Sequence, residues 1–108
     1  MSFHAIKIKI IFDNLQDMSN GKAGKKVPGG KLVRVDIEYS GDLIDSVRIT
    51  GDFFLYPEDV LEKIEFSLQG KKLDEVVSTV DSVLSGNGAT LVGVTSEDIF
   101  SILKEAMV

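Results

Sequence analysis

The sequence contains no cysteine and a single histidine, His4. Disulfides, thiolate nucleophiles, iron–sulfur ligation and zinc-finger sites are therefore excluded. A His-rich metal site is excluded as well, and we expect His4 to lie on an edge strand without a special role. No apolar run approaches the length of a membrane span. Lys7 and Lys9 interrupt the apolar stretch near the start, so we expect no signal peptide.

Positive charge is also scarce, because 12 lysines and arginines face 17 aspartates and glutamates, for a formal net charge of −5. Phosphate binding depends on Lys and Arg, so neither a nucleic acid nor an anionic membrane is expected as the main partner. Hydrophobic residues make up 44% of the 108-residue chain, which is normal for a folded globular protein. We expect one domain over residues 1–108.

The first half of the chain has the periodicity of strands. Residues 3–12 alternate between apolar and polar side chains, which predicts a strand. Residues 13–30 are rich in Gly and Lys and are interpreted as a long loop. Residues 31–39 and 43–50 alternate again around the turn residues 40–42, which predicts an antiparallel hairpin with one buried face.

The second half has the periodicity of helices. Apolar residues recur at helical spacing over residues 58–70 and again over residues 73–84. Residues 89–94 form a short apolar run without a clear period, and Thr95 or Ser96 is expected to cap a last helix. The fold class is therefore α+β, with an antiparallel sheet of about three strands followed by about three helices packed on one face.

One basic cluster stands out on this acidic chain. It could be a docking surface for a partner domain or a phosphate-bearing ligand, or an exposed and solvated lysine loop. The glycines of residues 27–31 resemble a phosphate cradle, but they lack the Walker A spacing and precede a strand instead of a helix. The members of the cluster are Lys22, Lys25, Lys26, Lys31 and Arg34.

A second group of candidates lies where the strands give way to the helices. Asp52 follows Gly51 and precedes two aromatics, so it either bonds backbone amides at the turn or lies at an interface. Of Phe53, Phe54 and Tyr56, we expect one to fill the core and another to be exposed as an interface anchor. Most other carboxylates fall on the wet face of the hairpin or in a first helical turn. The sequence holds no credible catalytic set, which favours an accessory or binding role.

Several segments together resemble a known family. They are residues 26–35, residues 47–54 with the sequence Gly-Asp-Phe-Phe at their end, the amphipathic helix over residues 58–70, and residues 93–99. The chain resembles the C-terminal accessory domain of lipoate–protein ligases over roughly residues 22–107. The Gly-Asp-Phe-Phe block is the most specific part of this resemblance.

The resemblance implies a function that the residues alone do not. Lipoate–protein ligases use ATP to convert lipoic acid to lipoyl-adenylate and then transfer the lipoyl group to a lysine of an acceptor domain. The catalytic lysine and the ATP, magnesium and lipoate sites belong to a larger domain, so this chain is expected to bind no cofactor itself. The small domain assists activation, and its fold is similar to that of iron–sulfur scaffold proteins, whose cysteines are missing here.

In some members of the family the two parts are separate chains, and this sequence resembles the separate small subunit. The implied partner is a catalytic lipoate–protein ligase chain in a cytoplasmic heterodimer, with lipoyl-acceptor domains as indirect partners. A stand-alone protein-binding or scaffold module with the same fold is the alternative, and an independent small enzyme is a third possibility that ATP binding by the isolated chain would support. No catalytic residue is carried over. The expected partner-interface residues are Lys22, Lys25, Lys26, Lys31, Arg34, Asp52, Phe53 and Phe54.

Overall fold

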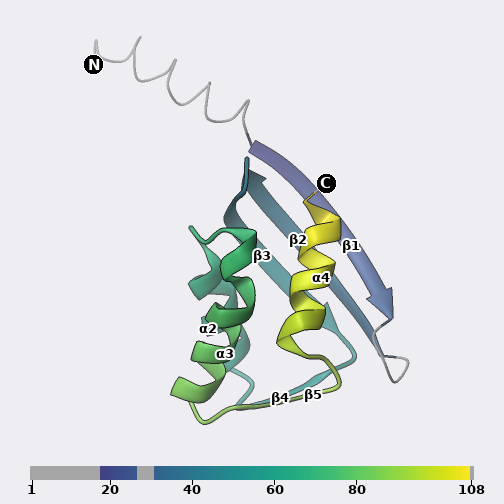
Figure 1. Cartoon of the computed structure of the whole chain (residues 1–108). Helices are drawn as coiled ribbons and strands as arrows, with labels where there is room; N and C mark the ends of the chain where they lie inside the picture. The colour runs from purple at the N-terminus through teal and green to yellow at the C-terminus, as the bar shows by residue number, and fades with distance from the viewer. Residues whose placement is uncertain (1–17, 27–30, 108) are drawn as a thin grey trace, which may run out of the picture.

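A three-stranded antiparallel sheet of order β1-β2-β3 carries the fold, in a computed structural model that describes residues 18–26 and 31–107 (Figure 1). The strands are β1 (Met18–Lys26), β2 (Leu32–Ser40) and β3 (Leu43–Gly51). Helices α2 (Val60–Leu68), α3 (Val76–Gly86) and α4 (Ser96–Ala106) follow, with the 3-10 turn η1 (Leu73–Glu75) before α3. The short strands β4 (Phe54–Tyr56) and β5 (Thr90–Val92) form a separate two-stranded ribbon.

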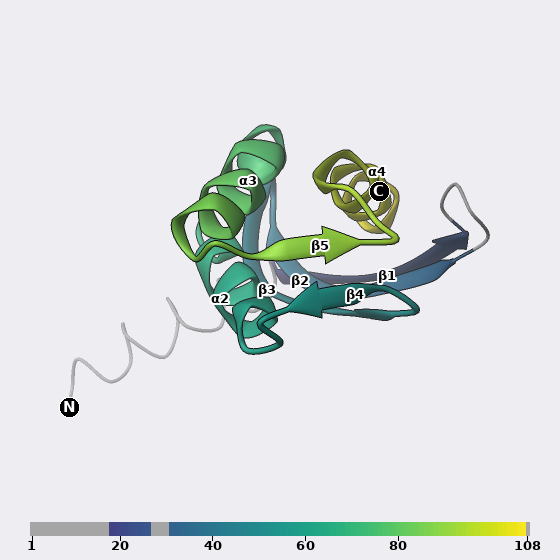
Figure 2. The same cartoon turned by 90° about the horizontal axis from the view of Figure 1, so that it is seen from below.

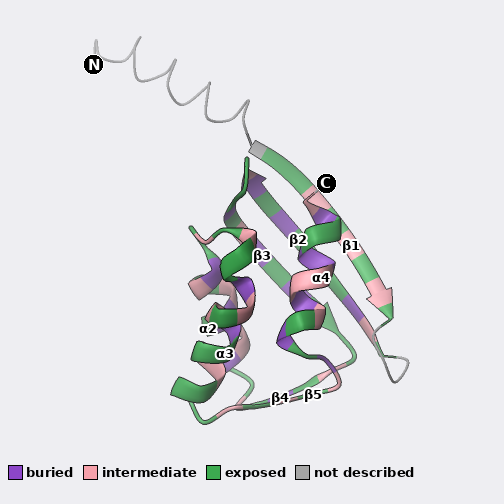
Figure 3. Ribbon diagram, in the orientation of Figure 1, coloured by how far each residue is buried: buried purple, intermediate pink, exposed green. Residues whose placement is uncertain are grey.

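Strands β2 and β3 form the predicted hairpin. Every second side chain of β2, beginning at Val33, is buried beneath the helices, while Arg34, Asp36 and Glu38 face away from them. In β3, Val47 and Ile49 are buried as expected. The buried faces of both strands meet the helices, and side chains of the opposite face, such as Arg34 and Arg48, are exposed. Buried and exposed residues alternate along both strands in Figure 3.

Strand β1 corrects the sequence-based interpretation, because residues 18–26 were expected in a loop. It pairs with β2 along its whole length, from Met18 opposite Ser40 to Lys26 opposite Leu32. Backbone pairing and contact with α4 hold this strand, so it needs no apolar alternation. The strand expected over residues 3–12 and the rest of the expected loop, residues 13–17 and 27–30, lie outside the described residues, as does His4.

The three helices lie on one side of the sheet, as predicted (Figure 1). Helix α2 packs against β3, α4 lies across β1 and β2, and α3 packs mainly against α2 and α4. No helix in the described ranges is long and apolar enough to cross a membrane. The fully buried core side chains come from all of these elements and include Val33, Ile44, Ile49, Ile64, Leu68, Val80, Ile102 and Leu103.

The capping residues of the last helix explain where it begins. The Thr95 hydroxyl accepts a hydrogen bond from the Asp98 backbone N–H at 3.0 Å, and the Asp98 carboxylate accepts one from the Thr95 N–H at 2.9 Å. This reciprocal pair is a capping box, which satisfies two backbone donors at the helix start. The prediction that Thr95 or Ser96 caps this helix is thereby confirmed, with Thr95 as the cap.

The ribbon of β4 and β5 was not predicted. Phe54 lies opposite Val92, Leu55 opposite Leu91, and Tyr56 opposite Thr90. The chain therefore makes a short extended stretch before α2, and the unassigned apolar run of residues 89–94 contains its pairing partner. Figure 2, which views the molecule from below, shows β4 and β5 side by side.

Candidate protein-interaction site

The end of β3 meets the start of β2 at a close backbone crossing. The Asp52 N–H donates a hydrogen bond to the Leu32 carbonyl oxygen at 2.8 Å. Gly51 has φ +152, and a Cβ placed there would lie 2.8 Å from the Val33 Cα and would also overlap the Leu32 carbonyl. Glycine is therefore the residue that fits, which gives a physical reason for the first position of the Gly-Asp-Phe-Phe block.

The aromatic side chains divide as the sequence predicted. Phe53 is half-buried and packs against the core, whereas Phe54 and Tyr56 are 58% and 64% exposed. Between the last two, Leu55 points inward and is buried. Val92 lies directly opposite Phe54 and is 55% exposed, so the outer face of the ribbon is largely apolar. Exposed aromatics beside aliphatic side chains are typical of interface cores.

A hollow of about 500 Å³ adjoins Phe54. The end of β3 from Ile49 to Gly51 forms one side, residues 53–55 form another, and Glu58, Leu61 and Glu62 complete it. Glu58 and Glu62 are its two charged residues within the described chain. From the sequence, such carboxylates were expected to cap helices or face solvent, and Val92 was not expected at a site. The position of Val92 near these carboxylates depends on the ribbon, which was not predicted. The spacing of Glu58 and Glu62 (i, i+4) could have indicated that the two carboxylates lie on one side of the helix.

Three of the predicted basic residues lie near this corner. Lys26 pairs with Leu32, whose carbonyl binds the Asp52 N–H, and Lys31 precedes Leu32. Arg34 lies opposite Gly24, and a Cβ added to Gly24 would come within 3.1 Å of the Arg34 Cγ. Lys26, Lys31 and Arg34 are all exposed.

The other two basic residues lie elsewhere. Lys22 is exposed in the middle of β1, with its Nζ 3.8 Å from an Asp36 carboxylate oxygen. Lys25 faces α4, where its Nζ donates to the Ser101 hydroxyl and to the Glu105 carboxylate, both at 3.0 Å. Gly21 and Ala23 share this face, and a Cβ on Gly21 would lie 2.8 Å from the Ala106 backbone carbon. The basic residues thus do not form one cluster, since Lys25 faces α4 while Lys22 and Arg34 are exposed on their strands, and their contact with a partner stays a prediction.

Asp52 is exposed, and no hydrogen bond of its carboxylate is found among the described residues. The backbone N–H of Asp52, not its carboxylate, stabilises the turn, so the Asp52 side chain can contact solvent or a partner. Asp52, Phe53 and Phe54 are brought together with the ribbon at one end of the sheet, since the Cβ of Gly93 would lie 3.5 Å from the Phe53 Cα. Their role in binding also stays a prediction.

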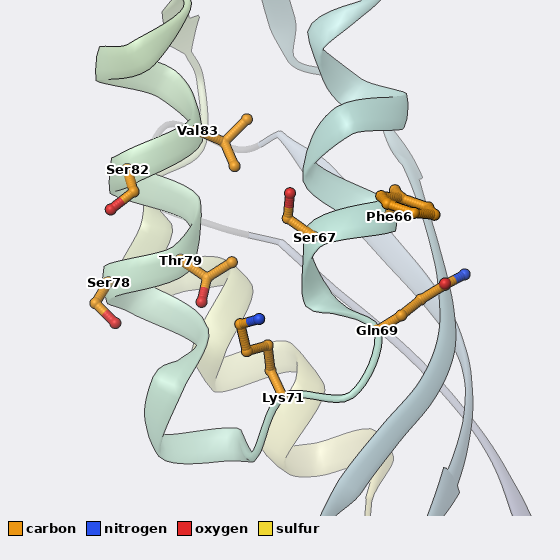
Figure 4. Close-up of a pocket in the computed structure, with 8 residues that line it drawn as sticks. All are labelled: Phe66, Ser67, Gln69, Lys71, Ser78, Thr79, Ser82 and Val83. Carbon is orange, nitrogen blue, oxygen red and sulfur yellow. The ribbon is translucent and has the colours of Figure 1, made fainter.

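A second depression lies between α2 and α3, with a volume of about 560 Å³ (Figure 4). Ser67, Ser78, Thr79 and Ser82 are among its lining residues, and Ser67 and Lys71 lie in the space between the helices. Phe66 projects from the opposite side of α2 and is 73% exposed. Within residues 18–26 and 31–107, no group of three or more His, Asp and Glu side chains could hold a metal ion. Lys71 is the one charged residue among those that line the depression, which include no histidine and no carboxylate.

Comparisons with known proteins place this geometry in context. No protein-family model matches the chain. The sequence is 30% identical over 73 residues to lipoate-protein ligase A subunit 2 of Thermoplasma acidophilum, covering 68% of this chain and 77% of that protein. A solved chain matches with a TM-score of 0.62 and 28% identity, covering 80% of this chain and 93% of its own length. It comes from the structure of an archaeal lipoylation system, a bipartite lipoate protein ligase and its E2 lipoyl domain from T. acidophilum.

Proposed function

The chain belongs to the family of lipoate–protein ligase A subunit 2, and we propose that it is a non-catalytic accessory subunit that binds a catalytic ligase chain. Bound there, it enables the ATP-dependent conversion of lipoate to lipoyl-adenylate. The observation that supports this proposal most is the Gly-Asp-Phe-Phe corner, where a ribbon with an exposed apolar face adjoins the end of the sheet.

We assign the ATP, magnesium and lipoate sites to the catalytic chain. The sequence has no cysteine, one histidine and no glycine-rich loop that leads into a helix, so the usual means of holding a nucleotide or activating a nucleophile are missing. The catalytic chain and this one form a heterodimer in the cytoplasm, and lipoyl-acceptor domains meet this chain only through that heterodimer.

A physical argument explains why a ligase would use such a subunit. An acyl-adenylate is hydrolysed when water reaches it, so the site that forms it gains from a cover that excludes water. A small folded domain that docks on the catalytic chain can order active-site loops and act as that cover. This role requires a well-shaped docking surface and no reactive side chain, which agrees with the features of the Gly-Asp-Phe-Phe corner.

A reconstitution assay tests the proposal. The catalytic chain of the same organism is incubated with ATP, magnesium and lipoate, with and without this chain, and lipoyl-adenylate is measured. We expect adenylate only when both chains are present. Transfer from presynthesised lipoyl-adenylate to an acceptor domain, measured in parallel, separates an effect on activation from an effect on transfer. A catalytic chain that neither binds this chain nor responds to it would favour a stand-alone protein-binding or scaffold module.

A further inference from the structure

The outer face of the ribbon is an apolar surface of limited size. Phe54 and Tyr56 are more than half exposed, and Val92 lies across from Phe54. Because an aromatic side chain offers roughly 150–250 Å², the three exposed side chains present on the order of 300 Å². A standard interface buries roughly 800 Å² on each partner. The patch can therefore be the centre of an interface, but the polar surface around it must supply the rest.

The hollow beside the patch is acidic, whereas Lys26, Lys31 and Arg34 are exposed near the start of β2. Glu58 and Glu62 line the hollow beside Phe54, and Asp52 and Asp59 are exposed at either end of residues 52–59. None of these four carboxylates forms an ion pair in the part of the chain that the structure describes. Desolvating them without a positive partner would be unfavourable, so whatever covers this surface must bring cations to it.

This charge pattern selects the occupant. A symmetric dimer centred on this patch would bring the two acidic hollows together, which is repulsive. We propose that the ribbon face docks the catalytic chain of the ligase, which supplies an apolar patch and a Lys or Arg side chain that enters the hollow between Glu58 and Glu62. The inference rests on the proposed function and adds the surface and the chemistry of recognition to it.

The hollow suits a cationic side chain for two reasons. Its two carboxylates attract the charge, and the Phe54 side chain lines the same space, so an ammonium or guanidinium group there can also contact an aromatic ring. The walls formed by Ile49 and Leu61 are apolar and can contact the aliphatic stem of a lysine or arginine. A small ligand is a poorer occupant, because the hollow is open and its polar groups are carboxylates alone apart from Thr50 and backbone atoms.

Two pairs of variants test this surface by calorimetric titration of the catalytic chain from the same organism into the full chain. Phe54→Ala should raise the Kd about tenfold or more, as expected for a central aromatic anchor. Phe66→Ala removes a phenylalanine that is even more exposed, on the outer side of α2, and should leave the Kd within about twofold. Val92→Thr keeps a β-branched side chain in β5 but makes the patch less apolar, so it should raise the Kd by a smaller factor. It tests the same surface if the Phe54→Ala variant does not fold.

The charge requirement has its own matched control. Glu58→Gln with Glu62→Gln should raise the Kd about fivefold or more at low salt and make binding less sensitive to salt. Asp42→Asn with Asp81→Asn changes the net charge equally on exposed residues away from the ribbon, and it should keep the wild-type salt dependence.

The outcomes separate the two proposals. Weakening by the ribbon and Glu58/Glu62 variants, with the controls unchanged, supports the surface. Normal binding by folded variants of both kinds overturns it and leaves the accessory function standing. Failure of the wild-type chain to bind the catalytic chain overturns the proposed function itself. A concentration-dependent dimer of this chain that the Phe54→Ala change abolishes would assign the ribbon to self-association and also overturn the inference.

Discussion

Replacing Gly51 by alanine is the change that tests the corner most sharply. The residue has φ +152, and its missing side chain leaves room for the backbone of β2. A Cβ at this position would lie 2.8 Å from the Val33 Cα, closer than real Cβ contacts come, and would overlap the Leu32 carbonyl. Both obstacles are backbone atoms, so no side-chain rotation relieves them, and the first residues of β2 must move.

The magnitude follows from three contributions. Placing a residue with a Cβ at an unfavourable positive φ costs about 1–3 kcal/mol, and overpacking a closely fitted site costs about 1–3 kcal/mol. Moving the Leu32 carbonyl weakens the 2.8 Å hydrogen bond from the Asp52 N–H, which contributes about 1 kcal/mol. Since one backbone shift relieves part of each contribution, we expect a total of about 3–5 kcal/mol, a large part of the stability of a small domain.

A matched variant isolates the steric contribution. Gly41 also has a positive φ, +60, but a Cβ there would meet nothing within 4 Å. Gly41→Ala should therefore lose only the conformational contribution, about 1–2 kcal/mol. With about 4–8 °C per kcal/mol for a domain of this size, the two variants should melt roughly 10–20 °C apart. Thermal melts followed by circular dichroism measure this difference, and equal melting temperatures would refute the close-crossing explanation of Gly51.

Three further changes are tested by urea unfolding. Leu103→Ala should destabilise the fold by about 2–5 kcal/mol, because Leu103 is fully buried on α4; a loss below 1 kcal/mol would contradict its place in the core. Glu65→Ala should cost about 1–3 kcal/mol, since its carboxylate accepts the Ile49 N–H at 2.8 Å; Glu65→Gln, which keeps an acceptor, should cost less, and equal losses would argue against this bond. Lys25→Glu should cost about 1 kcal/mol by breaking its contacts with α4, whereas Lys26→Glu should leave stability unchanged; a reversed order would contradict the two orientations.

The hairpin of β2 and β3 was predictable because each strand has one buried and one exposed face. The alternation that begins at Val33 matches the buried face of β2 residue by residue. The helices were predictable for a similar reason, since their apolar residues recur at helical spacing and Thr95 and Asp98 form a capping box. In these elements the local pattern and the tertiary environment favour the same structure.

Strand β1 was not predictable from periodicity. It lies at the edge of the sheet, and its residues facing α4 are Gly21, Ala23 and Lys25, which do not form an apolar series. The small residues are needed because α4 comes close to the strand, as the contact between Gly21 and the Ala106 backbone shows. Because α4 packs so closely, β1 needs small residues where the two elements meet, and these residues give the strand the composition of a loop.

The candidate site was predictable only in part. The Gly-Asp-Phe-Phe block indicated Asp52, Phe53 and Phe54. One aromatic was expected to fill the core, whereas Phe53 is half-buried and packs against it; the expected exposure of another is seen at Phe54, and their contact with a partner stays a prediction. The contribution of Val92 could not be seen, because β5 comes from a distant part of the chain and pairs with β4 over only three residues. The position of Lys25 was missed for the same reason, since its partners lie 76 and 80 residues away.

We propose that this chain completes a ligase by docking on its catalytic chain. The most direct test is to titrate this chain into a fixed amount of the catalytic chain with ATP, magnesium and lipoate, and to measure the initial rate of lipoyl-adenylate formation. We expect a rate that starts near zero, rises with added chain and saturates near equimolar amounts, with Phe54→Ala shifting the curve to higher concentration. Full adenylate formation without this chain, unchanged across the titration, would contradict this proposal.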